Sequence, residues 1–151
     1  MKELKVTKLH PNAKLPTRAT EQSAGLDLYA VEDFTLPGSR TSGIGVIIGQ
    51  YRARTGISVQ LDPGYEGTIR PRSGLAFNES VMGLFGTIDA DYQGELKVLL
   101  YNMHYKSVDF KKGDRIGQLV ISPVALPIAV NADKPAAPTK RGDGGFGSTG
   151  K

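Results

Sequence analysis

Apolar and polar residues alternate with a period of two in several short stretches of the chain. In residues 56–61 (GISVQL) the apolar side chains fall on one face, and alternation resumes at residues 65–70 (YEGTIR) after the turn DPG at 62–64. A strand places successive side chains on opposite faces, so each run predicts a half-buried strand. Two such runs around a Pro-Gly turn predict a β-hairpin over residues 56–70.

Further strands are predicted near Leu4, over residues 95–101 (ELKVLLY) and over residues 115–123 (RIGQLVISP), the last after the turn KGD at 112–114. No window longer than about ten residues keeps a helical period without Gly or Pro. The one short helix expected is at residues 73–80 (SGLAFNES). Many short strands separated by turns predict an all-β protein, either a sandwich, a jelly roll or a barrel.

The chain has 151 residues, of which 39% are hydrophobic, 19 are Gly and 9 are Pro. This length suits one domain that buries about 68–70% of the surface of its unfolded chain. From residue 123 the composition shifts to Pro, Ala and Lys, so we expect a β-domain over residues 1–130 and an extended C-terminal arm over residues 131–151. Such an arm can fold back on its own domain or cross to a neighbouring subunit.

Composition narrows the function classes. The absence of Cys excludes disulfides, thiolate nucleophiles and Cys-ligated zinc, and it fits a cytoplasmic or other intracellular location. No apolar run is long enough to span a bilayer, so we expect no membrane association, and residues 1–16 lack the apolar core of a signal peptide, so secretion by such a peptide is not expected. A net charge of +4 suits an anionic partner and is equally compatible with a nucleic acid and with a phosphate-bearing small molecule. Direct nucleic-acid binding is not expected, because aromatic and basic residues do not interleave on a strand face.

Carboxylates are the main candidates for proton transfer, because the only histidines, His10 and His104, lack zinc-ligand spacing. Residues 86–95 (GTIDADYQGE) carry Asp89 and Asp91 two positions apart. If this segment is extended, both carboxylates share a face. One interpretation is a general base beside a phosphate; the other is an ordinary acidic turn between two strands.

Three other clusters have a functional and a structural interpretation. The segment Arg72, Ser73 and Gly74 follows a strand and begins the predicted helix. These residues can together bind a phosphate. The structural interpretation is that Ser73 only caps the N-terminus of the helix. Gln118, in residues 113–118 (GDRIGQ), can bind a phosphate oxygen, or the segment is a hairpin turn with an internal Asp-Arg pair. Asp27 lies in the apolar segment AGLDL at 24–28 and either has a role in a site or faces solvent.

The C-terminal segment RGDGGFGSTG spans residues 141–150. Its glycines allow backbone N–H groups to approach an anion, Arg141 can bind phosphate, and Phe146 offers a flat face to a base. Composition alone predicts a disordered tail. The alternative is a lid that orders over a bound nucleotide.

Taken in order, these motifs resemble those of the homotrimeric dUTPase family. The matching segments are AGLDL at 24–28, RPRSGLA at 70–76, GTIDADYQGE at 86–95, GDRIGQL at 113–119 and RGDGGFGSTG at 141–150. The resemblance implies a distorted jelly-roll β-barrel subunit with one short helix and a C-terminal arm. It also implies a homotrimer with three active sites at subunit interfaces. The implied reaction is Mg2+-dependent hydrolysis of dUTP to dUMP and pyrophosphate, which keeps uracil out of DNA and supplies dUMP for thymidylate synthesis.

The resemblance also implies roles for individual residues. Asp89 matches the general base that activates water for attack on the α-phosphorus, and Tyr92 matches the residue that stacks under deoxyribose and rejects a 2′-OH. Main-chain groups of a hairpin between Gly83 and Lys97 are expected to read uracil. Thr87 and Ile88 belong to that segment.

For the phosphates, the implied contacts are Arg72, Ser73, Gly74 and Gln118. The triphosphate itself is expected to hold Mg2+, with no direct protein ligand and with Asp27 near the waters of the ion. In the tail, Phe146 is expected to cover the uracil. The γ-phosphate contacts are expected to be Arg141, Gly147, Ser148 and Thr149, supplied to the site of another subunit.

Two departures from the family pattern accompany this resemblance. Residues 42–53 (SGIGVIIGQYRA) are extra, and we expect an added surface hairpin that can mediate a partner contact. Gly83 stands where many bacterial relatives carry an Asn that contacts the base, so a main-chain contact is expected there. Two alternative functions are a dCTP deaminase-like nucleotide enzyme and a jelly-roll regulatory or protein-binding module that uses residues 42–53.

Overall fold

The computed structural model describes residues 3–134 and 137–144, and most of the described elements are short strands. Their bounds are β1 (Lys5–Lys8), β2 (Leu26–Tyr29), β3 (Phe34–Leu36), β4 (Arg40–Ser42), β5 (Gly45–Ile47), β6 (Gly49–Arg54), β7 (Ile57–Gln60), β8 (Tyr65–Arg70), α1 (Ser73–Glu79), β9 (Val81–Gly83), β10 (Gly86–Ile88), β11 (Lys97–Asn102), β12 (Val108–Phe110) and β13 (Arg115–Pro123). The helix and β13 lie where the sequence predicts them.

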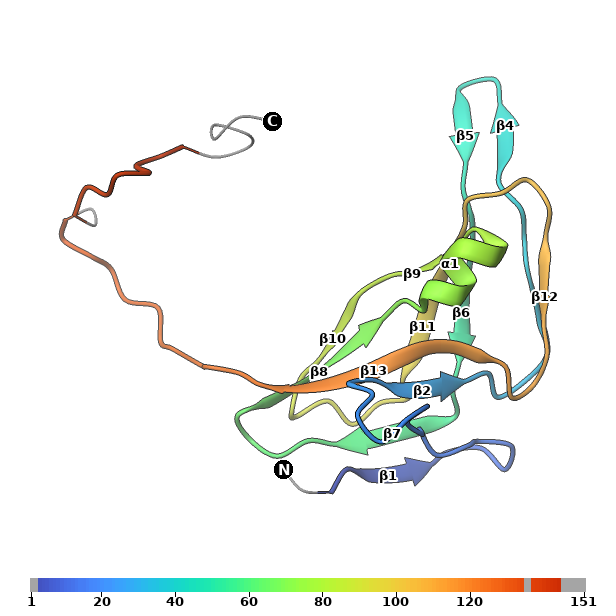
Figure 1. Cartoon of the computed structure of the whole chain (residues 1–151), viewed down its shortest axis with the longest axis horizontal. Helices are drawn as coiled ribbons and strands as arrows, with labels where there is room; N and C mark the ends of the chain where they lie inside the picture. Colours follow the sequence, from blue (N-terminus) through green and yellow to red (C-terminus); the bar gives the residue numbers. More distant parts are fainter. Residues whose placement is uncertain (1–2, 135–136, 145–151) are drawn as a thin grey trace.

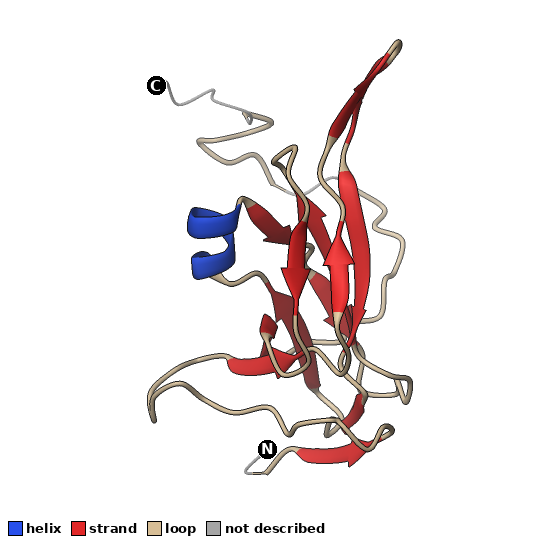
Figure 2. Ribbon diagram, turned by 90° about the vertical axis from the view of Figure 1, so that its right-hand side faces the viewer, coloured by secondary structure: helices blue, strands red, loops and turns tan. Residues whose placement is uncertain are grey.

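Two antiparallel sheets form the body of the domain (Figure 1). One has the strand order β10-β8-β13-β2 and the other β6-β11-β9, while β1-β7, β3-β12 and β4-β5 form two-stranded pairs. The strands build a distorted jelly roll with α1 at one side (Figure 2), which confirms the predicted all-β fold. In the described part of the chain, no helix has the length and apolar character needed to cross a bilayer.

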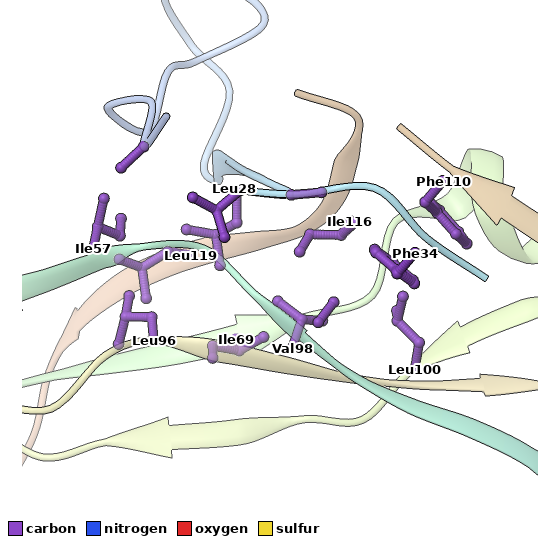
Figure 3. Packing of buried hydrophobic residues seen from close by; sticks show 14 of the residues in the cluster. Leu28, Phe34, Ile57, Ile69, Leu96, Val98, Leu100, Phe110, Ile116 and Leu119 are labelled. Atoms are coloured by element: carbon purple, nitrogen blue, oxygen red, sulfur yellow. The ribbon is translucent and has the colours of Figure 1, made fainter. Parts of the chain in front are cut away.

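The core lies between the two larger sheets (Figure 3). Alternate residues of β11 are buried, and Val98 and Leu100 are fully enclosed together with Leu28 of β2 and Leu119 of β13. Burial of each such side chain contributes about 1.5–3 kcal/mol relative to exposure. This packing fixes the positions from which the connections between the strands emerge.

The predicted hairpin over residues 56–70 is wrong. Its turn is present, because the Tyr65 N–H donates to the Asp62 carbonyl at 3.1 Å and Gly64 adopts a φ of +83°. However, β7 pairs with β1, and β8 pairs with β10 and β13. Alternation determines which face of a strand is buried, but it does not identify the strand that provides the backbone hydrogen bonds.

The predicted surface hairpin is present and consists of β4 and β5, which pair only with each other among the described strands. It projects away from the domain in Figures 1 and 2. At its base the Ser39 hydroxyl donates to the Asn102 carbonyl at 2.6 Å and accepts the Gly49 N–H at 3.2 Å. The hairpin spans residues 40–47 and so covers only part of the predicted segment 42–53, because residues 49–54 form β6, which pairs with β11 along its whole length.

The chain leaves the domain after β13. The Val124 N–H still donates to the Gly64 carbonyl at 2.9 Å, and beyond it the chain runs outward as an extended arm (Figure 1). Leu126, Ile128 and Val130 alternate along this arm, and their exposed fractions are 76%, 87% and 83%. The arm therefore carries apolar side chains that its own domain does not cover.

Candidate active site

A cavity of about 320 Å³ lies between β10 and the start of β11; we call it the β10–β11 pocket. It brings together the predicted residues Thr87, Ile88, Asp89, Tyr92 and Lys97. Its full lining is Ile69, Gly86, Thr87, Ile88, Asp89, Tyr92, Glu95, Leu96 and Lys97. Because β10 is an edge strand that pairs with β8 alone among the described strands, its second edge is free to offer main-chain groups to a ligand.

Asp89 lies at the rim of this pocket, immediately after β10, and is exposed. The Tyr92 N–H donates to the Asp89 carbonyl at 3.1 Å, so residues 89–92 form a turn and not the extended segment considered above. Asp and small residues favour such turns. Asp89 also lines a second hollow, of about 570 Å³, together with Val124 and Leu126 of the arm.

Glu95 closes the connection between β10 and β11. Its carboxylate accepts the Gly56 N–H at 2.8 Å and the Arg54 Nε–H at 3.1 Å, while its carbonyl accepts the Tyr92 hydroxyl at 3.1 Å. The hydrogen bond to Glu95 raises the pKa of the Arg54 guanidinium, which stays charged. Sequence reasoning assigned Glu95 no role; the one signal was a carboxylate at the start of an apolar strand.

Gly83 does not line the β10–β11 pocket. It pairs with Leu100 in the ladder between β9 and β11, whereas β10 leaves that ladder to pair with β8. The segment from Gly83 to Lys97 is therefore not the single hairpin that was expected. A Cβ at residue 83 would lie 3.3 Å from the Cα of Pro71, so close packing against the chain before α1 accounts for this glycine.

A second group of predicted residues, the arginine cluster, consists of Asp27, Arg72, Arg115 and Gln118. Asp27 accepts the Arg72 Nε–H at 3.1 Å and an Arg115 guanidinium N–H at 3.4 Å, and its side chain is only 13% exposed. The alternative interpretation, in which Asp27 faces solvent, is thus wrong. The internal Asp-Arg pair considered for residues 113–118 is also absent, because Arg115 bonds to Asp27 and the Asp114 carboxylate accepts the Lys111 N–H.

The other residues predicted to bind phosphate, Gln118, Ser73 and Gly74, lie near the end of β8. The Gln118 side-chain amide donates to the Pro71 carbonyl at 2.9 Å, and Gln118 lies opposite Asp27 in β2. Ser73 is the first residue of α1 and is exposed, whereas Arg72 occupies the N-cap position and no side chain caps the helix. The N-cap role considered for Ser73 is wrong. Apart from its chain neighbours and the backbone of α1, no atom lies within 4 Å of a Cβ placed on Gly74, so a ligand can approach this side of the helix.

The two groups lie at opposite ends of the β8–β10 pair. Ile88 is opposite Gly67, and Asp89 continues beyond that end, while Arg72 follows five residues after Gly67 at the other end. At about 3.3 Å per residue of strand, this places the two groups on the order of 15 Å apart. A single copy of the chain therefore does not bring Asp89 and Arg72 into one compact site.

The tail residues are only partly described. Arg141 donates from Nε to the Gly144 carbonyl at 2.9 Å, within its own turn. The predicted contacts Phe146, Gly147, Ser148 and Thr149 lie outside the described residues. Among residues 3–134 and 137–144, no cluster of three or more acidic or His side chains is arranged to hold a metal ion.

Comparisons with known proteins show the family of the chain. The dUTPase family model matches residues 11–150. The chain is 47% identical to the deoxyuridine 5′-triphosphate nucleotidohydrolase of Hydrogenobaculum sp. over 98% of both chains, and 43% identical to that of Nautilia profundicola over 99% of both. The solved structure of Staphylococcus bacteriophage 80alpha dUTPase with dUPNHPP superposes with a TM-score of 0.88, at 28% identity over the full length of both chains. The chain belongs to the dUTPase family.

Proposed function

We propose that this chain hydrolyses dUTP to dUMP and pyrophosphate by attack of water on the α-phosphorus, assisted by Mg2+. The observation that carries the proposal is the β10–β11 pocket, which places the carboxylate of Asp89 beside a cavity with a polar backbone edge and an aromatic side chain. The names of the relatives support dUTP as the substrate. The reaction keeps uracil out of DNA and supplies dUMP.

Uracil is read by the main chain of β10 at Thr87 and Ile88, with Lys97 on the opposite side of the pocket. Backbone N–H and C=O groups pair with the N3–H and the exocyclic oxygens of uracil. Cytosine presents the opposite donor and acceptor pattern at N3 and C4, so it leaves buried groups unpaired at a cost of about 1–3 kcal/mol each. Gly83 packs against Pro71, whose carbonyl accepts the Gln118 amide, so its contacts belong to the arginine cluster and not to the pocket.

Asp89 acts as the general base. Its exposed carboxylate at the pocket rim takes a proton from the attacking water, a role typically worth about 10²–10⁴-fold in rate. Tyr92 forms the floor under the deoxyribose, where its ring leaves no room for a 2′-OH. The alternative of a dCTP deaminase is disfavoured because the pocket lining combines Asp89 with Tyr92, as in the dUTPase motif.

The arginine cluster, with Ser73 and Gly74, binds the triphosphate. Arg72 is oriented by its bond to Asp27, and one N–H of the Gln118 amide remains for a phosphate oxygen because the other donates to Pro71. The residues fit Mg2+ held by the phosphates: each Asp27 oxygen keeps a lone pair for a water of the ion after bonding one arginine. When bound, the ion neutralises phosphate charge and polarises the α-phosphorus.

The active form is a homotrimer in which each site combines parts of different copies. The separation of Asp89 from Arg72 within one copy supports this assignment, because both must face the same nucleotide. The uncovered apolar side chains of Leu126, Ile128 and Val130 suit an arm that packs on a neighbouring copy. In that arrangement the tail closes the neighbour's site, with Phe146 over the base and Arg141, Gly147, Ser148 and Thr149 on the γ-phosphate.

A substrate panel tests the proposal. Pyrophosphate release is measured with dUTP, dCTP, dTTP and UTP, with Mg2+ and with excess chelator. We expect release from dUTP alone, and a large loss of activity when chelator removes Mg2+. Equal turnover of UTP or dCTP, or an absence of dUTP hydrolysis by well-folded protein, would contradict the proposed function.

A further inference from the structure

Gly94 occupies a position where the backbone does not require glycine. Its φ lies outside the left-handed region that favours glycine, unlike that of Gly64. Nevertheless, a Cβ built on residue 94 would lie 2.6 Å from Cζ of Tyr92 and 3.0 Å from its Cε2. The phenol ring therefore fills the space that any larger residue at 94 would need.

The end of the Tyr92 ring has a fixed anchor. Its hydroxyl donates to the Glu95 carbonyl at 3.1 Å, and Glu95 is itself held through its carboxylate by Gly56 and Arg54. The next residue, Leu96, is 1% exposed, and its N–H donates to the Ile57 carbonyl at 2.8 Å. The acceptor of the tyrosine hydroxyl is thus tied to the core, while Tyr92 remains 44% exposed beside the pocket.

We propose that Gly94 is a positioning residue for sugar specificity: the missing Cβ lets the Tyr92 ring fold back onto Glu95, which fixes the floor under the deoxyribose. The inference rests on the proposed function and deepens it, because it names the residue that sets the position of the Tyr92 ring under the deoxyribose. A methyl group at residue 94 displaces the ring and breaks the bond to the Glu95 carbonyl. A ring without a fixed position no longer excludes a 2′-OH.

The stability of the fold is a separate quantity. The atoms displaced by the methyl group belong to the outer end of a half-exposed side chain, which can move without disturbing the core. The backbone at residue 94 accepts alanine. Gly94→Ala is therefore expected to change substrate selectivity while the melting temperature falls by no more than about 2–4 °C, the shift expected for the loss of one hydrogen bond. A purely structural role of Gly94 would lower the melting temperature and leave the selectivity unchanged.

The test compares kcat/KM for dUTP and for UTP in the full-length protein, together with the melting temperature. We expect Gly94→Ala to lower the dUTP/UTP ratio about tenfold, as expected for the loss of one neutral hydrogen bond that holds the ring. The matched control is Gly43→Ala, at a glycine that also lacks a positive φ and where, apart from its two chain neighbours, no atom lies within 4 Å of the position that a Cβ would take. Its ratio should remain that of the unmodified chain.

A double-mutant cycle makes the result specific. In a Tyr92→Leu background no ring meets the added methyl group, so Gly94→Ala should change the ratio no further. A ratio unaffected by Gly94→Ala, or lowered equally with Leu at residue 92, would overturn the inference. An unmodified chain that fails to prefer dUTP would instead refute the proposed function, so the two failures are distinguishable.

Discussion

The connection from β10 to β11 and the β4–β5 hairpin are both surface segments, but they are held very differently. Glu95 and Leu96 tie the first to residues 54–57 through side-chain and backbone hydrogen bonds. The hairpin is fixed at its base by Ser39, and at its tip Ile44 is fully exposed. The segment that carries the candidate base is therefore anchored to the core along its length, whereas the β4–β5 hairpin is held at its base.

The largest effect is expected at the anchored segment. Asp89→Asn should lower kcat for dUTP by about 10²–10⁴-fold, because the amide cannot accept the proton of the attacking water. Nucleotide binding should persist, since the substitution is nearly isosteric at an exposed position. Steady-state kinetics and calorimetric titration with a non-hydrolysable analogue check this. Asp91→Asn is the matched control, and equal losses in both variants would contradict the assignment.

Truncation after Lys140 removes the glycine-rich tail without touching the described core. Activity should fall on the order of 10²-fold, because the nucleotide is no longer covered and oriented. The truncated chain should keep its melting temperature and its oligomeric state, measured by light scattering. Full activity without residues 141–151 would show that the tail is not a lid.

A smaller loss is expected at the arginine cluster. Arg72→Lys keeps the charge but loses the planar guanidinium that bonds to Asp27 and to phosphate, so KM for dUTP should rise roughly 10–100-fold. Arg52→Lys, at an exposed position of β6, provides a matched control. An unchanged KM in Arg72→Lys would show that Arg72 does not bind phosphate.

The smallest effect should come from the hairpin. Replacing residues 40–48 with two glycines leaves Ser39 and Gly49 able to meet at the base, where they already share a hydrogen bond. Turnover of dUTP should stay within about twofold, and thermal stability should change little, because the removed side chains are mostly exposed. Loss of activity or folding would show that this region is coupled to the site.

The sequence predicts the local elements well where one signal decides them. The turn residues before Arg115 predict where β13 begins, and the helix-breaking residues on either side of α1 predict its short length. The ordered motifs predict that Thr87, Asp89 and Tyr92 are neighbours. The predicted hairpin over residues 56–70 fails because strand partners depend on tertiary packing.

The supporting contacts of the site were also beyond sequence reasoning. Glu95 bonds across 39 residues to Gly56, and Arg115 bonds across 88 residues to Asp27. Neither hydrogen bond can be predicted from the periodicity of residues or the spacing of motifs in a single sequence. The same holds for Gly94, because its reason for being glycine is the ring of Tyr92 and not the backbone conformation.

The central claim is that each active site joins the β10–β11 pocket of one copy to the arginine cluster of another. Asp89→Asn and Arg72→Ala chains, each inactive alone, can be mixed, unfolded and refolded together, and dUTP turnover measured. If the sites are shared, random assembly restores about one quarter of the unmodified activity, because about one site in four receives both intact parts. A mixture as inactive as its two components would contradict the account.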